Sequence, residues 1–386
     1  MKRIVFLLSC LLMFVANPAS ARSNGIKEKK HFLQITEHPR IQLAILLDTS
    51  GSMEGLIEQT KSQLWKIVNE LATARYKSIQ PTLEIALYEY GNDGIPAKDE
   101  YVRMILPFTT DLDKVSEELF KLQTNGGQEY CGAAIQKATS ELAWSKNNDD
   151  LKVIYIAGNE PFNQGKISYT ISCKNAISQG IVVNTIFCGY ASEGINSFWK
   201  HGAELAEGYY MNIDHNQSTV FIETPFDDDL VKLNQELNET YLAYGNEGKA
   251  KKANQQRQDK NAEAYGSGNI AERTVSKSSA IYNSASWDLV DAAKEESFNV
   301  NSIKDEELPD ILKGLSKEEK EKVIANMKNK REEVRKKIAD IDKKRSEYIS
   351  EKKKELGGSG TLDAALSTSI RSIATRKQFT FETAQP

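Results

Sequence analysis

Three oxygen-bearing side chains stand at alternate positions directly after an apolar run. Asp48, Ser50 and Ser52 follow Leu43–Leu47, which has the length and composition of a buried strand. A carboxylate and two hydroxyls are hard oxygen donors, which suit Mg²⁺, Mn²⁺ or Ca²⁺ and not a thiolate-binding metal. Open α/β sheets bind ligands at the carboxyl ends of their strands. The spacing therefore predicts a divalent-cation site at the end of the first strand.

Strand and helix patterns alternate between residues 40 and 243. The alternation predicts an α/β fold with a doubly wound, mostly parallel six-stranded sheet and helices on both faces. The link after the second strand is short, which predicts a hairpin and an antiparallel edge strand. The expected strands are Ile41–Leu47, Leu83–Tyr88, Val102–Phe108, Val153–Ala157, Ile181–Phe187 and Tyr209–Ile213.

The Asp-x-Ser-x-Ser spacing after a strand resembles the metal-ion-dependent adhesion site of von Willebrand factor A (VWA) domains. Four further stretches are similar to a group of secreted bacterial VWA proteins that have a helical C-terminal extension. The resemblance implies a VWA or Rossmann-like sheet domain and an exported compartment, and it implies little about activity. The four stretches are Tyr88–Asp93, Asn125–Gly132, Ala157–Phe162 and Ser286–Asp291.

Two of the three loops depart from the family's ligand pattern. The family places a threonine in the second loop, where this chain has Glu129, and an aspartate in the third, where it has Asn159 or Glu160. Glu129 adds a negative charge and Asn159 removes one, so the formal charge of the site is conserved. The candidate metal ligands are Asp48, Ser50, Ser52, Glu129 and Asn159, with Glu160, Asn92 and Asp93 as neighbours or partner contacts.

The resemblance implies a protein-binding module that holds Mg²⁺, or Ca²⁺ or Mn²⁺ in its place. An acidic side chain of the partner would fill the cation's open position. In the alternative, Glu129 closes the site, and the protein is a cell-envelope scaffold that acts through its charged C-terminal helix. A metal-dependent hydrolase is a distant third hypothesis, because the sequence has no Gly-x-Ser-x-Gly, His-Glu-x-x-His or phosphate-loop motif. We therefore expect no enzymatic activity.

The N-terminus has the features of an export signal. A basic start, Met1–Arg3, precedes the apolar run Ile4–Ala16 and the small residues Ala19–Ala21. We expect a signal peptide over residues 1–21, a linker over 22–39 and a periplasmic or secreted chain. The net charge of −4 gives no reason to expect a nucleic-acid partner.

Three cysteines remain once the expected signal peptide is removed. Cys131, Cys173 and Cys188 have no C-x-x-C spacing, which disfavours a zinc ribbon or a thioredoxin-like redox site. An oxidising compartment favours one disulfide among them, with three separate buried thiols as the alternative.

The C-terminal part of the chain differs in composition from the sheet region. We expect a polar linker or helical segment over 244–285, a charged helical region over 286–356 and a flexible tail over 357–386. One long helix is predicted from Leu315 to Leu356, with sparse apolar residues at steps of three, four and seven. That spacing predicts a coiled-coil or helical-hairpin seam, although Arg331, Arg345 and Lys352 fall within it.

Overall fold

The centre of the fold is a six-stranded sheet with the strand order β4-β3-β1-β5-β6-β7. Every neighbouring pair is parallel except β3 and β4, so the antiparallel edge strand expected from the short link is confirmed. The strands are β1 (Arg40–Asp48), β3 (Thr82–Tyr90), β4 (Val102–Thr109), β5 (Leu151–Gly158), β6 (Val182–Cys188) and β7 (Tyr210–Ile213). This computed structural model describes residues 38–54, 56–213, 222–355 and 362–382. The expected signal peptide and nearly all of the expected linker 22–39 lie outside those residues.

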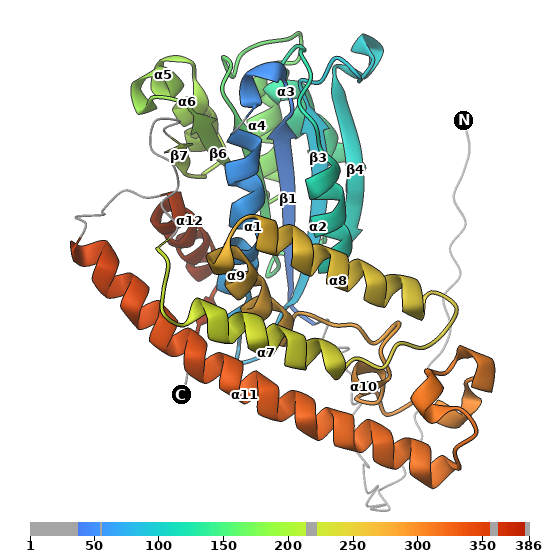
Figure 1. Cartoon of the computed structure of the whole chain (residues 1–386). Helices are drawn as coiled ribbons and strands as arrows, with labels where there is room; N and C mark the ends of the chain where they lie inside the picture. The colour runs from blue at the N-terminus through green and yellow to red at the C-terminus, as the bar shows by residue number, and fades with distance from the viewer. Residues whose placement is uncertain (1–37, 55, 214–221, 356–361, 383–386) are drawn as a thin grey trace, which may run out of the picture. The chain divides into compact units, whose positions relative to one another are not determined.

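Alternate residues of β1 enter two separate hydrophobic cores. Leu43, Ile45 and Leu47 pack in one core, and Ala44 and Leu46 pack in the other, as the two-residue period of a strand requires. The first core lies under α1 (Leu56–Ala72) and α2 (Leu112–Lys121). The second lies under α3 (Cys131–Glu141), α4 (Tyr169–Ser178) and α6 (Trp199–Leu205), with the short α5 (Ala191–Asn196) before α6. The predicted doubly wound α/β sheet is therefore confirmed (Figure 1).

The expected flexible tail contains ordered structure in its described part. Residues Leu362–Arg376 form α12, and Phe379–Phe381 form β8, which pairs antiparallel with β2 (Ala74–Tyr76). Four residues of α12 are buried in the first core: Leu366, Ile370, Ile373 and Ala374. They recur at helical spacing, so α12 covers the sheet beside α1 and β7 (Figure 1).

A buried hydrogen bond joins α12 to the sheet and gives a test of this packing. Tyr155 Oη and Ser369 Oγ lie 2.8 Å apart, and both residues are buried. A double-mutant cycle of Tyr155→Phe and Ser369→Ala, measured by urea unfolding, is expected to give a coupling free energy of about 1 kcal/mol. Thr368→Ala, on the exposed side of α12, should change the unfolding free energy by less than about 0.5 kcal/mol. Zero coupling would mean that α12 does not lie on β5 in solution.

The region between the sheet and α12 forms a helical layer. Its helices are α7 (Asp227–Glu239), α8 (Gly248–Ala264), α9 (Ser267–Ser278), α10 (Leu289–Ala292) and α11 (Lys317–Glu355), with three short 3-10 turns at Val300–Ser302, Asp305–Glu307 and Asp310–Leu312. Residues 244–285, expected as a polar linker or helical segment, form α8 and α9, which pack on α2 and α1. Contacts group the described residues from His38 onward into one compact unit.

The long charged helix is present, but its seam is filled from within the chain. Ile324, Val334 and Ile338 of α11 are buried, and the helix packs along α7 and α9 (Figure 1). Arg331 and Arg345 are buried in the same seam, where each pairs with carboxylates of the helical layer. The expected coiled-coil seam is thus used for packing on neighbouring helices of the same chain.

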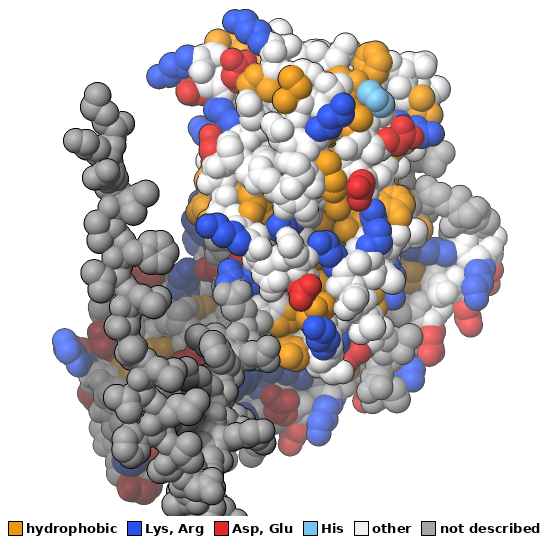
Figure 2. Space-filling view, turned by 180° about the vertical axis from the view of Figure 1, so that it is seen from behind, with side chains coloured by type: hydrophobic (Ala, Val, Ile, Leu, Met, Phe, Trp, Pro, Cys, Tyr) orange, Lys and Arg blue, Asp and Glu red, His pale blue; other side chains and the backbone are white. Residues whose placement is uncertain are grey.

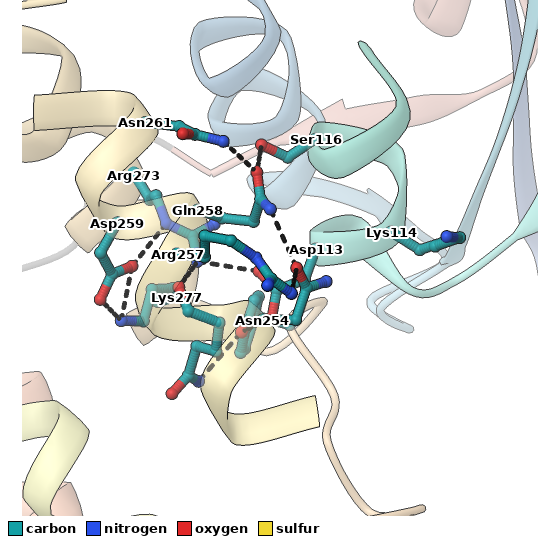
Figure 3. Close-up of polar contacts among 12 residues, drawn as sticks. Asp113, Lys114, Ser116, Asn254, Arg257, Gln258, Asp259, Asn261, Arg273 and Lys277 are labelled. Carbon is teal, nitrogen blue, oxygen red and sulfur yellow. Dashed lines mark hydrogen bonds and ion pairs between the residues drawn. The ribbon is translucent and has the colours of Figure 1, made fainter. Parts of the chain in front are cut away.

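A buried polar network ties the helical layer to the sheet region (Figure 3). Arg273 on α9 donates hydrogen bonds to Asp113 on α2 at 2.8 Å and to Asp259 on α8 at 2.6 Å. Lys277 donates to Asp259 at 2.8 Å and to Asn234 on α7 at 2.8 Å. Burial opposes ionisation of Asp259, but Lys277 and Arg273 hold its pKa below the ordinary value. The network therefore fixes how α7, α8 and α9 sit against α2.

The three cysteines of the described residues form no disulfide. Cys131, Cys173 and Cys188 are free and buried, so the expected disulfide is wrong and the alternative of separate thiols holds. They lie on three different elements, at the start of α3, within α4 and at the end of β6. Burial raises the pKa of Cys173 to about 12, which keeps this thiol protonated and unreactive at neutral pH.

None of the helices in the described ranges has both the length and the apolar content that crossing a membrane requires.

Candidate metal centre

In the first loop, the Asp48 side chain accepts a hydrogen bond from the backbone two residues further on. Asp48 ends β1 and is fully buried, and the Ser50 N–H donates to Asp48 Oδ1 at 2.8 Å. A 3-10 turn over Gly51–Met53 follows, and it brings Ser50 Oγ within 2.9 Å of Ser52 Oγ. Asp48 Oδ2 is buried and receives no hydrogen bond of normal geometry from the described residues. The loop thus presents two hydroxyls and one unsatisfied carboxylate oxygen.

The third loop reaches the first through Asn159. Asn159 Oδ1 accepts a hydrogen bond from Ser52 Oγ at 3.0 Å, and Asn159 Nδ2 donates to the Ser52 carbonyl at 3.3 Å. Gly158, the last residue of β5, lies against Asp48: a Cβ there would come within 3.0 Å of Asp48 Oδ2. The absence of a side chain at Gly158 keeps the space beside this buried oxygen free of a Cβ atom.

The second loop brings Glu129 to the same place. Gly91 lies between the two carboxylates, because a Cβ at that glycine would come within 2.7 Å of Asp48 Oδ1 and 3.1 Å of Glu129 Cγ. The Glu129 side chain, 8% exposed, also hydrogen-bonds with Ser50. The geometry therefore brings together Asp48, Ser50, Ser52, Glu129 and Asn159, from three separate loops.

Asn92, Asp93 and Glu160 occupy the surroundings of this centre. Asn92 Nδ2 donates to the carbonyls of Thr49 at 3.3 Å and Gln123 at 3.0 Å, so Asn92 pins the loops together. The Asp93 N–H donates to the Gly126 carbonyl at 2.7 Å, and its carboxylate is exposed. Glu160 Oε2 accepts from Gln164 at 3.3 Å. Asn92 therefore positions the loops, and Asp93 and Glu160 add negative charge around the centre.

The centre carries negative charge that no basic side chain compensates. Burial, with a contribution from Glu129, raises the pKa of Asp48 to about 7. Burial and the charges of Glu160 and Asp93 likewise raise the pKa of Glu129. Within the part of the chain that the structure describes, no lysine or arginine forms an ion pair with Asp48 or Glu129. A bound divalent cation would supply the missing positive charge and favour both ionised carboxylates.

The donor set fits a hard cation. The described residues contain no metal-binding group made of three or more histidine, cysteine, aspartate or glutamate side chains. A cation at this centre would therefore need hydroxyl and amide oxygens in addition to carboxylates. The centre has two carboxylates, and its other donors are two hydroxyls and an amide oxygen. Oxygen donors of this kind match Mg²⁺ or Ca²⁺, and the buried, unpaired Asp48 Oδ2 is an oxygen that such an ion would satisfy.

The hydrogen bonds of Ser50 and Ser52 in the described ranges do not involve a histidine. Ser50 and Ser52 hydrogen-bond to each other, and Ser52 bonds to Asn159. His201 Nδ1 pairs instead with Tyr169 Oη at 2.9 Å, on α4. His31 and His215 lie outside the described residues. His201 therefore does not serve as the base of a serine–histidine pair with Ser50 or Ser52.

The sequence reasoning missed the glycines that make room for the centre. Gly91 has a φ of +80°, and Gly127 lies so close to Gly91 that a Cβ would come within 1.9 Å of the Gly91 carbonyl oxygen. Only residues without a side chain allow the loops after β3 and before α3 to approach each other in this way. The signal was present as glycine-containing turns at Gly91–Gly94 and Gly126–Gly127, which the sequence alone indicates only as chain breaks.

Gly91→Ala is expected to weaken cation binding at least about tenfold, because its Cβ would displace the Asp48 carboxylate. Gly245→Ala is the matched control: Gly245 has a φ of +75°, and nothing lies within 4 Å of the added Cβ. Backbone strain should lower the unfolding free energy of each variant by about 1 kcal/mol, and the contact with Asp48 adds a further loss in Gly91→Ala only. Calorimetric titration with Mg²⁺ separates them, and equal affinities would contradict the placement of Gly91 against Asp48.

The sequence comparisons agree with this geometry in part. Residues 43–160 match the family model of the von Willebrand factor type A domain, from β1 to the loop after β5. Asp48, Glu129 and Asn159 all lie within the match. No curated protein matches the chain.

Solved structures with similar chains include VWA domains. The VWA domain of SpRpn10 is 16% identical, over 45% of this chain and 88% of that chain, with a TM-score of 0.35. The conserved hypothetical protein BatB from Bacteroides thetaiotaomicron is 16% identical over 45% and 90%, with a TM-score of 0.36. Proximal thread matrix protein 1 from the mussel byssus, with a zinc-occupied metal-ion-dependent adhesion site, is 14% identical over 47% and 43%, with a TM-score of 0.34. Likenesses at this level carry no inference about what the chain binds.

Proposed function

We propose that the von Willebrand factor type A domain that residues 43–160 match acts in this chain as a cation-dependent protein-binding module. Asp48, Ser50 and Ser52 would hold Mg²⁺, or Ca²⁺ or Mn²⁺, together with Asn159. A carboxylate of the partner protein would complete the coordination of the cation. The protein would then be a binding protein and not an enzyme.

The observation that carries the proposal is the buried, unpaired oxygen of Asp48. Among the described residues, Asp48 Oδ2 receives no hydrogen bond of normal geometry, and the Asn159 backbone and the Ser50 side chain offset only part of the effect of burial on the pKa of this carboxyl, which also lies beside Glu129. Leaving a buried carboxylate oxygen unsatisfied is costly, and buried charges are normally paired or coordinate a metal. A cation beside Asp48 and Ser52 removes that cost, which is why we infer a metal and not a structural helix cap.

The exposed side of the centre supports access by a partner. Glu129 is buried, whereas Ser52 is exposed and Asn159 is partly exposed. A partner's carboxylate would approach over Ser52 and Asn159, while Glu129 stays beneath and adds charge. In the absence of a cation, the charges of Asp48, Glu129 and Glu160 would repel that carboxylate. Binding is therefore expected to depend on the cation.

Capture from a cell-envelope extract tests the proposal. Immobilised wild-type chain is expected to retain a partner in Mg²⁺ and to release it when a chelator is added. Asp48→Ala is expected to retain nothing above background in either condition, with an unchanged far-UV circular dichroism spectrum. Retention by Asp48→Ala, or retention in the presence of chelator, would refute the mechanism.

The scaffold alternative receives less support. It requires α11 to interact with other chains, but the apolar seam and both buried arginines of α11 contact the chain's own helices. The outward face of α11 carries acidic and basic residues together, such as Glu332, Glu333, Lys336 and Lys337. Over its whole length α11 has 15 lysine and arginine residues against 10 aspartate and glutamate residues, so the attraction that it offers is to an anionic surface.

We also propose that the chain is exported, with a signal peptide removed after Ala21. The support is the N-terminal sequence pattern, on residues outside the described structure. Intact-mass measurement of the protein recovered from a periplasmic or secreted fraction is expected to give a chain that begins at Arg22. A mass that includes residues 1–21 would contradict cleavage.

A further inference from the structure

Three large apolar side chains are exposed on one short segment after β6. Tyr190, Ile195 and Phe198 are 49%, 48% and 42% exposed, and they lie on and beside the six-residue helix α5. Figure 2 shows hydrophobic side chains exposed at its upper right, on the side where α5 and α6 lie. Exposed large apolar residues are usually scattered singly, so three within nine residues call for an explanation.

The segment lies beside the metal centre. The Phe162 N–H donates to the Ser197 carbonyl at 2.9 Å, and Trp199 Nε1 donates to the Glu160 carbonyl at 2.8 Å. These bonds tie the α5–α6 turn to the loop that begins with Asn159, whose side chain bonds to Ser52. Because β6 is parallel to β5, the segment leaves the sheet at the same edge as that loop. The segment with the exposed apolar residues therefore lies at the same end of the strands as Asp48 and Asn159.

Phe198 is held in an unusual backbone conformation. Its φ of 72° and ψ of 8° lie in the left-handed region, which bulky L-residues seldom adopt. The Gly202 N–H donates to the Phe198 carbonyl at 2.9 Å, and the aromatic ring approaches Tyr169 with centroids 6.1 Å apart. The fold thus keeps a strained phenylalanine partly exposed, one residue after the Ser197 carbonyl that accepts the hydrogen bond from Phe162, and strain of this kind suggests a functional role.

The charges around the segment restrict what it can bind. Three acids, Glu160, Glu193 and Glu204, lie on this segment or on the loop tied to it, against one exposed base, Lys200, whose Nζ lies 3.9 Å from Glu204 Oε1, so the net charge is negative. These carboxylates disfavour an anionic lipid surface. A protein segment that brings one carboxylate to a cation, with apolar side chains next to it, matches both the oxygen cluster and the apolar residues.

We propose that Ile195 and Phe198, with Tyr190 beside them, form an apolar rim that selects the partner of the metal centre. The partner would be an extended protein segment in which large apolar residues flank the metal-binding acid. This inference rests on the proposed function, because the partner's acid must reach the cation for the rim to contact its neighbours. The rim adds selectivity that the cation alone cannot provide, since the cation recognises any accessible carboxylate.

Short synthetic peptides test the rim on the full chain in Mg²⁺. The first peptide has a central glutamate between leucines, the second has the same glutamate between serines, and the third has glutamine between leucines. Wild type is expected to bind the first about tenfold more tightly than the second, because each leucine buries apolar surface on the rim. The third peptide is expected not to bind, and chelator is expected to abolish binding of the first.

The informative variant is Phe198→Asn combined with Ile195→Ser. Asparagine tolerates the left-handed conformation, so the turn should be retained, and circular dichroism checks the fold. The variant is expected to lower the preference for leucine over serine from about tenfold to about one, with unchanged binding of the second peptide. Ile79→Ser is the matched control, because Ile79 has the same 42% exposure as Phe198. Ile79 precedes the first residue of β3, whereas the loop near the metal centre follows the last residue of β3.

The outcomes distinguish this inference from the proposed function. A double variant that keeps the tenfold preference overturns the rim and leaves cation-dependent binding intact. Equal binding of the glutamate and glutamine peptides, or binding that survives chelator, overturns the proposed function and the rim with it. Wild type that binds none of the three peptides also overturns both.

Discussion

Asp48→Asn is expected to abolish cation binding and the stabilisation that the cation gives to the folded chain. For wild type, Mg²⁺ at about one hundred times its dissociation constant should raise the unfolding free energy by about 2.7 kcal/mol. The variant should show no increase, because an amide at position 48 supplies no negative charge beside Ser50 and Ser52. Urea unfolding with and without Mg²⁺, with calorimetric titration of the cation, measures both effects.

In chelator, where no cation is bound, Asp48→Asn is expected to raise the unfolding free energy. Asp48 is buried with an unpaired oxygen, and Glu129 lies beside it, so its charge destabilises the cation-free fold. Removing that charge should make cation-free Asp48→Asn more stable than cation-free wild type by about 1 kcal/mol or more.

Glu193→Gln, at an exposed acid on α5, provides the control and should change neither quantity. A variant that is less stable than wild type in chelator and still gains stability from Mg²⁺ would contradict the assignment of Asp48 to the centre.

The sheet and the first half of the centre could be predicted because they depend on local patterns. The apolar run of β1 and the alternate Asp48, Ser50 and Ser52 are adjacent in sequence, so strand period and ligand chemistry appear in one window. Glu129 and Asn159 could be proposed only through the resemblance to a family, since nothing local says which loops meet. Their convergence depends on Gly91 and Gly158, whose role is visible only once the strands are paired.

The C-terminal third was harder to predict because its order comes from contacts distant in sequence. The helix α12 buries Leu366 and Ile370 against a sheet whose last strand ended at Ile213. The helices α8 and α9 are polar in composition, and they are fixed by buried hydrogen bonds and ion pairs such as Arg273 with Asp113. A pattern-based prediction expects buried residues to be apolar, so it leaves residues 244–285 open between a polar linker and a helical segment.

Arg331 on α11 is another polar side chain whose burial the sequence pattern does not indicate. It is fully buried, and its Nη1 donates to Asp288 at 2.7 Å and to Asp291 at 3.1 Å. Its Nε and Nη2 donate to the hydroxyl and carbonyl of Thr240, and the guanidinium stacks 4.1 Å from the centre of the Tyr241 ring. From sequence, an arginine at a seam position weakens the case for a packed helix, yet here it provides the packing.

Arg331→Met is expected to lower the unfolding free energy by about 3–5 kcal/mol, because it strands a buried carboxylate without its partner. Asp288 is fully buried, and burial raises its pKa even with Arg331 beside it. Lys330→Met, at the adjacent residue, removes only an exposed ion pair with Glu239 and should cost less than about 1 kcal/mol. Urea unfolding of the full chain measures both.

Adding Asp288→Asn to Arg331→Met separates stranded charge from lost packing. If the uncompensated carboxylate dominates, the second substitution removes the charge and should recover part of the lost free energy, although each single substitution destabilises. Asp291 needs no such change, because Lys294 still pairs with it at 2.8 Å. If Arg331→Met costs no more than Lys330→Met, the seam of α11 is open in solution. The helix would then be available to other chains, and the scaffold alternative would regain its basis.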